Sequence, residues 1–185
     1  MARVPYPDPK SLSPETQEVL GKMPPLNIFR MMAGGEGLLK AFTRMGNYLL
    51  FKSKLNPTLR EIAIIRAGVL SKAKYEVYQH ERIGRDLGMS DALITAIHAG
   101  ADAAAFDDLQ RLVMRYTDDV VKNVRAGDAT FNPLSKRLSL LEMQELTVTI
   151  GYYMMVSRFL ETFDVDFEQA GTKGVSFPDS QKAKS

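Results

Sequence analysis

The chain has 185 residues, of which 45% are hydrophobic and 25% are charged, which is typical of one folded domain and excludes a fibrous or largely disordered protein. It contains no cysteine, which excludes disulfides, thiolate metal sites and thiol-based redox chemistry. The formal net charge is only +2 and the basic residues are scattered, so we expect no nucleic-acid partner.

The two ends of the chain have compositions that differ from the body. Residues 1–14 contain four prolines, which favour an extended arm that packs on another part of the chain. Residues 171–185 are rich in Gly, Ser and Lys and predict a mobile tail. No signal-like stretch is present, and no segment approaches the roughly 18 apolar residues of a membrane helix, so we expect a soluble, cytoplasmic protein without a membrane partner.

Helical patterns fill the body of the chain in sequence order. We expect helices at about 14–23, 28–32, 38–51, 57–70, 73–87, 90–100, 109–124 and 139–163. The starts are marked by Asn56 before Pro57, by Ser90, and by Ser139 with Glu142 in a capping box. No convincing strand pattern or internal repeat interrupts them. The sequence therefore predicts one all-α domain over residues 1–185.

The predicted helix 73–87 places two ionisable side chains on its apolar side. At the 3.6-residue period, Glu76 and His80 share a stripe with Ile83 and Leu87. The two are four residues apart, close enough for direct contact on one helix face. An ordinary Glu–His pair on an exposed face is the simpler interpretation. The stripe position favours a functional pair, because a buried charge needs a partner or a role.

The predicted helix 57–70 is apolar nearly all round, which indicates a place at the centre of the fold. Glu61 lies in its middle beside Ile62 and Ile64, so its carboxylate also needs a partner. Arg66 is the other charged residue that we single out there. A structural counter-ion to a buried carboxylate and a binding residue for a substrate anion are about equally supported roles for Arg66.

Residues 56–97, NPTLREIAIIRAGVLSKAKYEVYQHERIGRDLGMSDALITAI, resemble the core motif of the carboxymuconolactone decarboxylase and alkylhydroperoxidase D family, and PPLNIFRMMA upstream resembles the lead-in of its longer members. The resemblance implies an alkylhydroperoxidase D-like helical bundle. In the family's peroxidase branch, a glutamate on one helix is followed by Cys-x-x-Cys and a histidine on the next. Glu61 matches that glutamate and His80 the histidine, while Ala73 and Glu76 stand at the two cysteine positions.

This departure removes the thiolate and the disulfide on which peroxide reduction depends in that branch, so thiol peroxidase activity is not expected. The proton-handling groups remain: Glu61, Glu76 and His80 would form a carboxylate–imidazole–carboxylate cluster suited to proton transfer at a carbon next to a carbonyl. The resemblance thus implies a lyase, a decarboxylase-like enzyme of aromatic compound breakdown that acts on a small lactone or carboxylated molecule. A cysteine-less relative of the peroxidases without that activity, or a non-catalytic oligomeric binding or scaffold protein, is the alternative.

Few other partners are indicated. One His with two Glu makes a metal site the weaker interpretation of the cluster, and nothing predicts a cofactor.

Tyr75 and Tyr78 lie off the stripe, so we expect both to contact a neighbouring helix. The resemblance implies a homo-oligomer, a trimer or hexamer, and the apolar runs 49–51 and 152–156 suggest a subunit interface independently.

Overall fold

The computed structural model describes residues 1–178, and all regular structure within this range is helical. The helices are α1 (Pro14–Gly21), α2 (Asn27–Met32), α3 (Glu36–Phe51), α4 (Pro57–Leu70), α5 (Lys74–Asp86), α6 (Asp91–Ala99), α7 (Asp108–Asn123), α8 (Asp128–Ser135) and α9 (Leu140–Phe163), preceded by a short 3-10 turn, Pro9–Ser11. The all-α class expected from the sequence is confirmed. No helix in this range is both long enough and apolar enough to cross a membrane.

Side-chain caps start the helices where the sequence predicts them. The side chain of Asn56 accepts hydrogen bonds from the backbone N–H groups of Thr58 and Leu59 at the start of α4. At the start of α9, Ser139 and Glu142 form the predicted capping box. These caps satisfy N–H groups that lack partners in the first turn of a helix, so they fix the register of α4 and α9.

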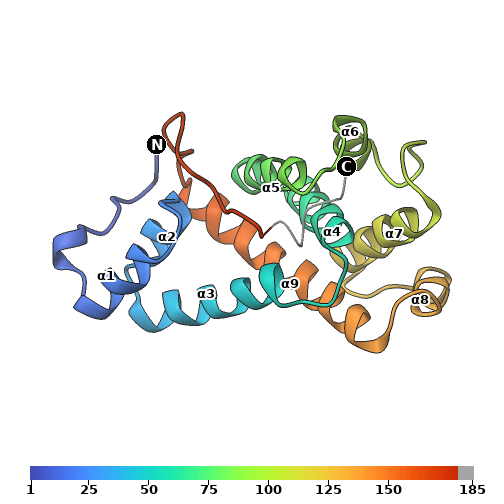
Figure 1. The fold of residues 1–185 in the computed structure, drawn as a ribbon, viewed down its shortest axis with the longest axis horizontal. Coiled ribbons are helices and arrows are strands. Elements are labelled where there is room, and N and C mark those ends of the chain that lie inside the picture. The colour runs from blue at the N-terminus through green and yellow to red at the C-terminus, as the bar shows by residue number, and fades with distance from the viewer. Residues whose placement is uncertain (179–185) are drawn as a thin grey trace.

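Helix α4 is the central element of the fold. It packs against α5, α7, α9 and α6 (Figure 1), and every residue from Leu59 to Gly68 is buried. Figure 1 also shows the long α9 crossing the molecule from α8 towards α2. A helix surrounded on all sides has no solvent-facing stripe for its charged residues, so Glu61 must find its partners inside the protein.

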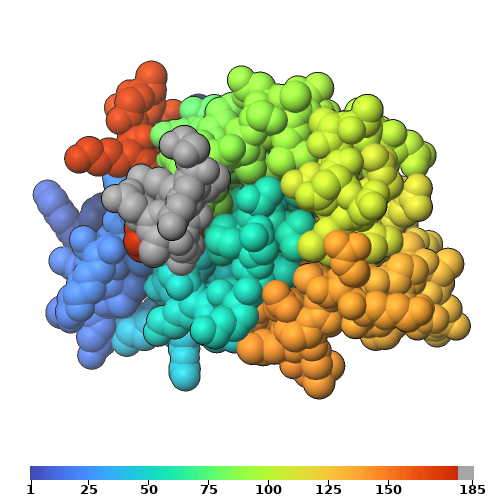
Figure 2. All heavy atoms as spheres, turned by 45° about the vertical axis from the view of Figure 1, so that its right-hand side comes forward, coloured from blue at the N-terminus to red at the C-terminus, as the bar shows by residue number. Residues whose placement is uncertain are grey.

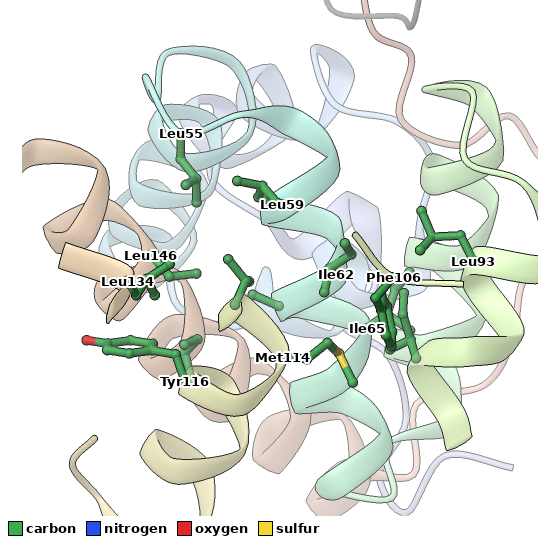
Figure 3. Close-up of a cluster of buried hydrophobic side chains, with 14 of the residues drawn as sticks. Leu55, Leu59, Ile62, Ile65, Leu93, Phe106, Met114, Tyr116, Leu134 and Leu146 are labelled. Carbon is green, nitrogen blue, oxygen red and sulfur yellow. The ribbon is translucent and has the colours of Figure 1, made fainter. Parts of the chain in front are cut away.

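Two apolar clusters lie on opposite sides of α4. The first joins α4 to α6, α7, α8 and the start of α9; Figure 3 shows Leu59 of α4 pointing towards Leu55, and Ile62 and Ile65 of α4 on the side of Phe106 and Met114. The second joins α2, α3, α5, the end of α9 and the C-terminal segment. The ionisable residues considered below lie on the side of the second cluster, because Glu76 and His80 project from α5.

The N-terminal arm packs on the segment that follows α9. The backbone N–H of Arg3 donates to the carbonyl of Phe163, and that of Ala2 donates to the Asp166 carboxylate. In Figure 2 the C-terminal residues coloured red lie close to the blue N-terminal region. The extended arm thus contacts the end of α9, as its proline content suggested.

Part of the predicted tail packs against the second cluster. Phe177 is only 4% exposed and belongs to the second cluster, where its ring lies 5.0 Å from that of Phe51. An aromatic side chain among Gly, Ser and Lys thus occupies an apolar site, which the composition of residues 171–178 did not indicate. Residues 179–185 of the predicted tail lie outside the described range.

Two other features differ from the sequence-based expectations. Helix α8 was not predicted, since it is short and contains Pro133. The helix expected to run to residue 124 and to end at Gly127 stops at Asn123, where Val124 takes a left-handed conformation with φ of 68°. Gly127 is instead the N-cap residue of α8, which begins at Asp128. Neither difference affects α4 or α5, the helices that carry Glu61, Glu76 and His80.

Candidate active site

Glu61 is fully buried in the middle of α4 and has two cationic neighbours. Its Oε1 accepts a hydrogen bond from Arg60 Nε at 3.0 Å, and its Oε2 lies 2.6 Å from His80 Nδ1. Burial alone would raise the pKa of Glu61, but His80 and Arg60 outweigh it and hold that pKa below its usual value. Glu61 is therefore an ionised carboxylate clamped between two donors.

The second carboxylate of the cluster lies on the other side of the imidazole. Glu76 Oε1 is 3.1 Å from His80 Nε2, an ion-pair distance, but the ring N–H is not aligned on it and this oxygen has no hydrogen-bond donor within residues 1–178. Glu76 and His80 are four residues apart on α5, so the helix itself sets their contact. The imidazole thus lies between two carboxylates, and the structure brings together the three residues singled out from the sequence.

The two carboxylates change the protonation of His80. Burial would lower the pKa of His80, but Glu61 and Glu76 outweigh it and raise the pKa to about 9. The ring is therefore an imidazolium at neutral pH, with protons on both nitrogens. The sequence predicted this carboxylate–imidazole–carboxylate cluster, and the two charges that face the ring raise the pKa of His80 above the neutral range.

A cavity of about 280 Å³ opens on this cluster, near the lower end of the range of small-molecule sites. Glu76, His80 and Gln79 line one side of it, and its other walls are mainly apolar, with Ile28, Phe29, Phe42, Leu50, Ile83 and Val156 among them. The ring of Tyr153 meets that of His80 edge to face, with centroids 4.7 Å apart. Glu76 and His80, but not Glu61, therefore face a space suited to a small, largely apolar molecule.

Residues 36–119, from α3 to α7, match the sequence model of the carboxymuconolactone decarboxylase family. The matched range contains Glu61, Glu76 and His80. Over this range the chain is similar to the carboxymuconolactone decarboxylase family. No curated protein matches the chain in sequence.

Several solved structures share the fold of this chain. An alkylhydroperoxidase AhpD core protein from Ralstonia eutropha JMP134 has a TM-score of 0.78 and 18% identity, over 90% of this chain and 92% of the other. A peroxidase-related protein from Silicibacter sp. TM1040 has a TM-score of 0.76 and 22% identity, over 92% of each chain. The debrominase Bmp8, in complex with 2,3,4-tribromopyrrole, has a TM-score of 0.69 and 15% identity, over 83% of this chain and 82% of its own. The expected alkylhydroperoxidase D-like fold is thus confirmed.

The two arginines of α4 lie in different environments. Arg66 does not line the cavity: its guanidinium forms a two-pronged pair with Asp118 of α7, at 2.5 and 2.9 Å, and donates to the carbonyl of Ile97. This geometry favours the counter-ion role for Arg66 over the substrate-binding role. Arg60 was missed, although its position four residues before the fully buried Ile64 could have revealed it.

The environment of other singled-out residues also bears on the site. Tyr75 lines the cavity and is 4% exposed, contrary to the expectation that it contacts only a neighbouring helix, while Tyr78 is 46% exposed. Within residues 1–178, no group of three or more His, Asp or Glu side chains is placed to hold a metal ion. Glu61, Glu76 and His80 do not form such a group because the two carboxylates approach opposite ring nitrogens of His80 rather than one common point.

The raised pKa of His80 predicts how stability depends on pH. A group whose pKa rises from about 6.5 to about 9 on folding stabilises the fold fully below pH 6.5, and this contribution is lost as pH rises through 9. The loss amounts to about 3 kcal/mol. Urea unfolding at pH 6.5 and 9.5 should show a larger fall for the native chain than for His80→Gln. An equal fall in both proteins would contradict the assignment of the pKa shift to His80.

Proposed function

We propose that the chain is an enzyme in which the His80 imidazolium gives a proton to a carbanion formed in the cavity. The observation that carries this proposal is the His80 ring held between two carboxylates at the wall of an apolar cavity. Nδ1 is engaged by Glu61, whereas no acceptor within residues 1–178 is aligned with Nε2–H. A charged donor without an aligned acceptor, facing a small-molecule space, is suited to general acid catalysis.

The match of residues 36–119 to the carboxymuconolactone decarboxylase family favours decarboxylation of a small lactone or carboxylic acid as the reaction. In such a step the bond between the carboxylate and its carbon breaks, and carbon dioxide leaves. The electron pair moves into a neighbouring carbonyl, which gives an enolate. The Nε2 proton of His80 then passes to the carbon, and solvent returns a proton to the ring. The apolar walls disfavour water, which strengthens the interaction between the imidazolium and the enolate.

The size and walls of the cavity support a substrate with a single small ring. The debrominase Bmp8, which shares the fold, is in complex with 2,3,4-tribromopyrrole, a compact halogenated ring. By analogy, an apolar ring in this cavity would leave His80 and Glu76 to contact its polar substituent. A panel of small lactones and aromatic or unsaturated acids, incubated with the protein in D₂O, tests the proposal. Deuterium in the decarboxylated product, at the carbon that lost the carboxylate, is the expected result.

A non-catalytic binding or scaffold protein is the alternative. It would retain the Glu–His cluster as a structural element, and it would bind members of the panel without releasing carbon dioxide. The cavity in contact with His80 and Glu76 favours the enzyme, because a purely structural cluster would be sealed on all sides. Binding without release of carbon dioxide or deuterium exchange across the panel would favour the alternative.

We expect no thiol-dependent reduction of hydroperoxides, despite the peroxidase-related proteins that share the fold. The chain has no cysteine, and Ala73 and Glu76 occupy the two positions at which the resemblance places the cysteines of the peroxidase branch. A carboxylate and a methyl group cannot form the disulfide that this chemistry needs. Peroxide consumption with a dithiol donor should equal that of a heat-inactivated control. Clear turnover above that control would contradict this expectation.

A homo-oligomer remains our proposal for the quaternary structure, but the surface that supports it differs from the one expected. The runs 49–51 and 152–156 are mainly core, since Leu49, Tyr153 and Val156 are at most 4% exposed. Instead, exposed apolar side chains of α3 and α9 line a shared groove, among them Met45, Tyr48, Leu141 and Val148. Light scattering at micromolar concentration should give a trimer or hexamer. A monodisperse monomer would contradict it.

A further inference from the structure

One nitrogen of the Arg60 guanidinium has no hydrogen-bond partner. Arg60 is 1% exposed; its Nε donates to Glu61 and its Nη1 donates to the carbonyl of Leu50 at 2.9 Å. Nη2 is buried and finds no acceptor within residues 1–178. Buried charged donors are almost always paired, because an unsatisfied one costs free energy. The protein therefore holds a buried guanidinium next to Glu61 in which Nε and Nη1 have acceptors but Nη2 has none among residues 1–178.

An aromatic ring from the C-terminal segment covers this guanidinium. The Phe177 ring centroid lies 5.4 Å from Arg60 Cζ, and the neighbouring Val175 and Ser176 line the cavity. Leu50, which accepts a hydrogen bond from Arg60, lines the same cavity. A ring face attracts a guanidinium less strongly than a carboxylate that accepts a hydrogen bond from it. Phe177 is thus a weak occupant of a position where a carboxylate would bind better.

The segment that carries Phe177 is anchored at its start and has no regular structure towards its end. The Glu168 carboxylate accepts hydrogen bonds from the backbone N–H of Asn27 and from the side chains of Tyr75 and Gln79. Arg82 donates to the carbonyl of Thr172. No helix includes residues 173–178, so they can leave the cavity without breaking one, while Glu168 keeps the preceding part in place.

We propose that Arg60, which lies next to the cavity but does not line it, binds a carboxylate when a small apolar acid displaces Phe177 to reach it. The role of this residue in catalysis rests on the proposed function, whereas the binding does not. Arg60 and His80 bind the two oxygens of the same Glu61 carboxylate, so they lie on either side of it. An acid held at Arg60 would therefore have its ring in the cavity that His80 lines. This arrangement specifies a substrate with one carboxylate on a compact apolar body.

Calorimetric titration with benzoate and with benzamide, its neutral analogue of the same shape, tests the proposal without requiring turnover. Benzoate should bind the native chain more tightly than benzamide. Phe177→Ala removes the competing ring, so it should tighten benzoate binding about tenfold and leave benzamide unchanged. Phe167→Ala is the matched control, since Phe167 lies in the same segment but packs on Tyr75 and Tyr78, and it should change neither affinity.

A second variant tests the arginine itself. Arg60→Lys keeps a charge beside Glu61 but loses the planar fork, so the preference for benzoate over benzamide should fall. If this variant does not fold, trypsin cleavage after the exposed Lys173 provides the second measurement: benzoate should accelerate it in the native chain and benzamide should not. Equal binding of benzoate and benzamide to the native chain and to Phe177→Ala would overturn the proposal. So would a weaker affinity of Phe177→Ala for both compounds, which would make Phe177 a wall of the cavity. If no panel compound released carbon dioxide but the native chain still bound benzoate more tightly than benzamide, the proposed reaction would be rejected and the binding site at Arg60 would stand.

Discussion

Replacing His80 with glutamine is expected to lower the rate of proton delivery by roughly 100-fold to 10,000-fold, the range of effects for a general acid. Glutamine is close to imidazole in reach, and its amide can still donate a hydrogen bond to Glu61, but it cannot give up a proton near neutral pH. The rate is measured as carbon dioxide release, or as deuterium incorporation in D₂O, with whichever panel compound the native chain converts. Circular dichroism should show an unchanged helix content.

The chain contains a matched control for this variant, since it has only one other histidine. His98 lies at the end of α6 with its side chain 44% exposed, and its Nε2 is 2.7 Å from Glu81. His98→Gln should leave the rate unchanged. A folded His80→Gln protein with the native rate would exclude His80 as the proton donor and would reject the proposed function.

The neighbouring carboxylate should set the pH range of the same reaction. Because Glu61 and Glu76 together raise the pKa of His80 to about 9, the native rate should stay high up to that pH and fall above it as the imidazolium loses its proton. Glu76→Gln removes one of these two charges and lowers the pKa of His80. The fall in rate should then begin at a lower pH, with a smaller effect on the rate in mildly acidic solution. An unchanged pH profile would mean that Glu76 does not tune the ring.

Local patterns in the sequence were sufficient to predict all the α-helices of residues 1–178 except α8, and part of the site. Capping residues such as Asn56 and Ser139 act within one turn, and the contact between Glu76 and His80 follows from spacing on one helix. Glu61 was identified because a carboxylate on a helix that is apolar on all sides cannot be solvated. Each of these inferences depends on residues close together in the chain, where the period of the helix already fixes the geometry.

The parts that could not be predicted depend on contacts between distant segments. Arg66 and Arg60 are both buried arginines on α4, but only the fold decides that Asp118 of α7 takes Arg66 while Arg60 remains beside Glu61. The position of Phe177 over Arg60 joins residues more than a hundred apart, and nothing local in a Gly- and Lys-rich segment indicates it. The protonation of His80 is of the same kind, because it depends on the sum of charges from α4 and α5.

Glu61→Gln is expected to have the largest effect on stability. The substitution keeps the shape of the side chain but removes the negative charge between Arg60 and His80, both of which remain buried. Breaking a buried ion pair by removing one partner typically costs about 3–5 kcal/mol, since it leaves an uncompensated charge. His80 can relieve part of this cost by losing its proton, so its pKa should fall in the variant, whereas Arg60 cannot.

Urea unfolding at pH 6.5, read by circular dichroism, measures the effect as a shift of the midpoint at an unchanged slope. Glu18→Gln makes the same chemical change in a solvent-exposed pair with Lys22 and should not shift the midpoint measurably, because exposed pairs contribute little. Above pH 9 the native chain has itself lost the His80 proton, so the difference between native chain and Glu61→Gln should narrow there. A midpoint equal to that of the native chain at pH 6.5 would show that Glu61 is not the ionised centre of the cluster. The raised pKa of His80 would then need another cause, because the charge of Glu61 contributes more to it than that of Glu76.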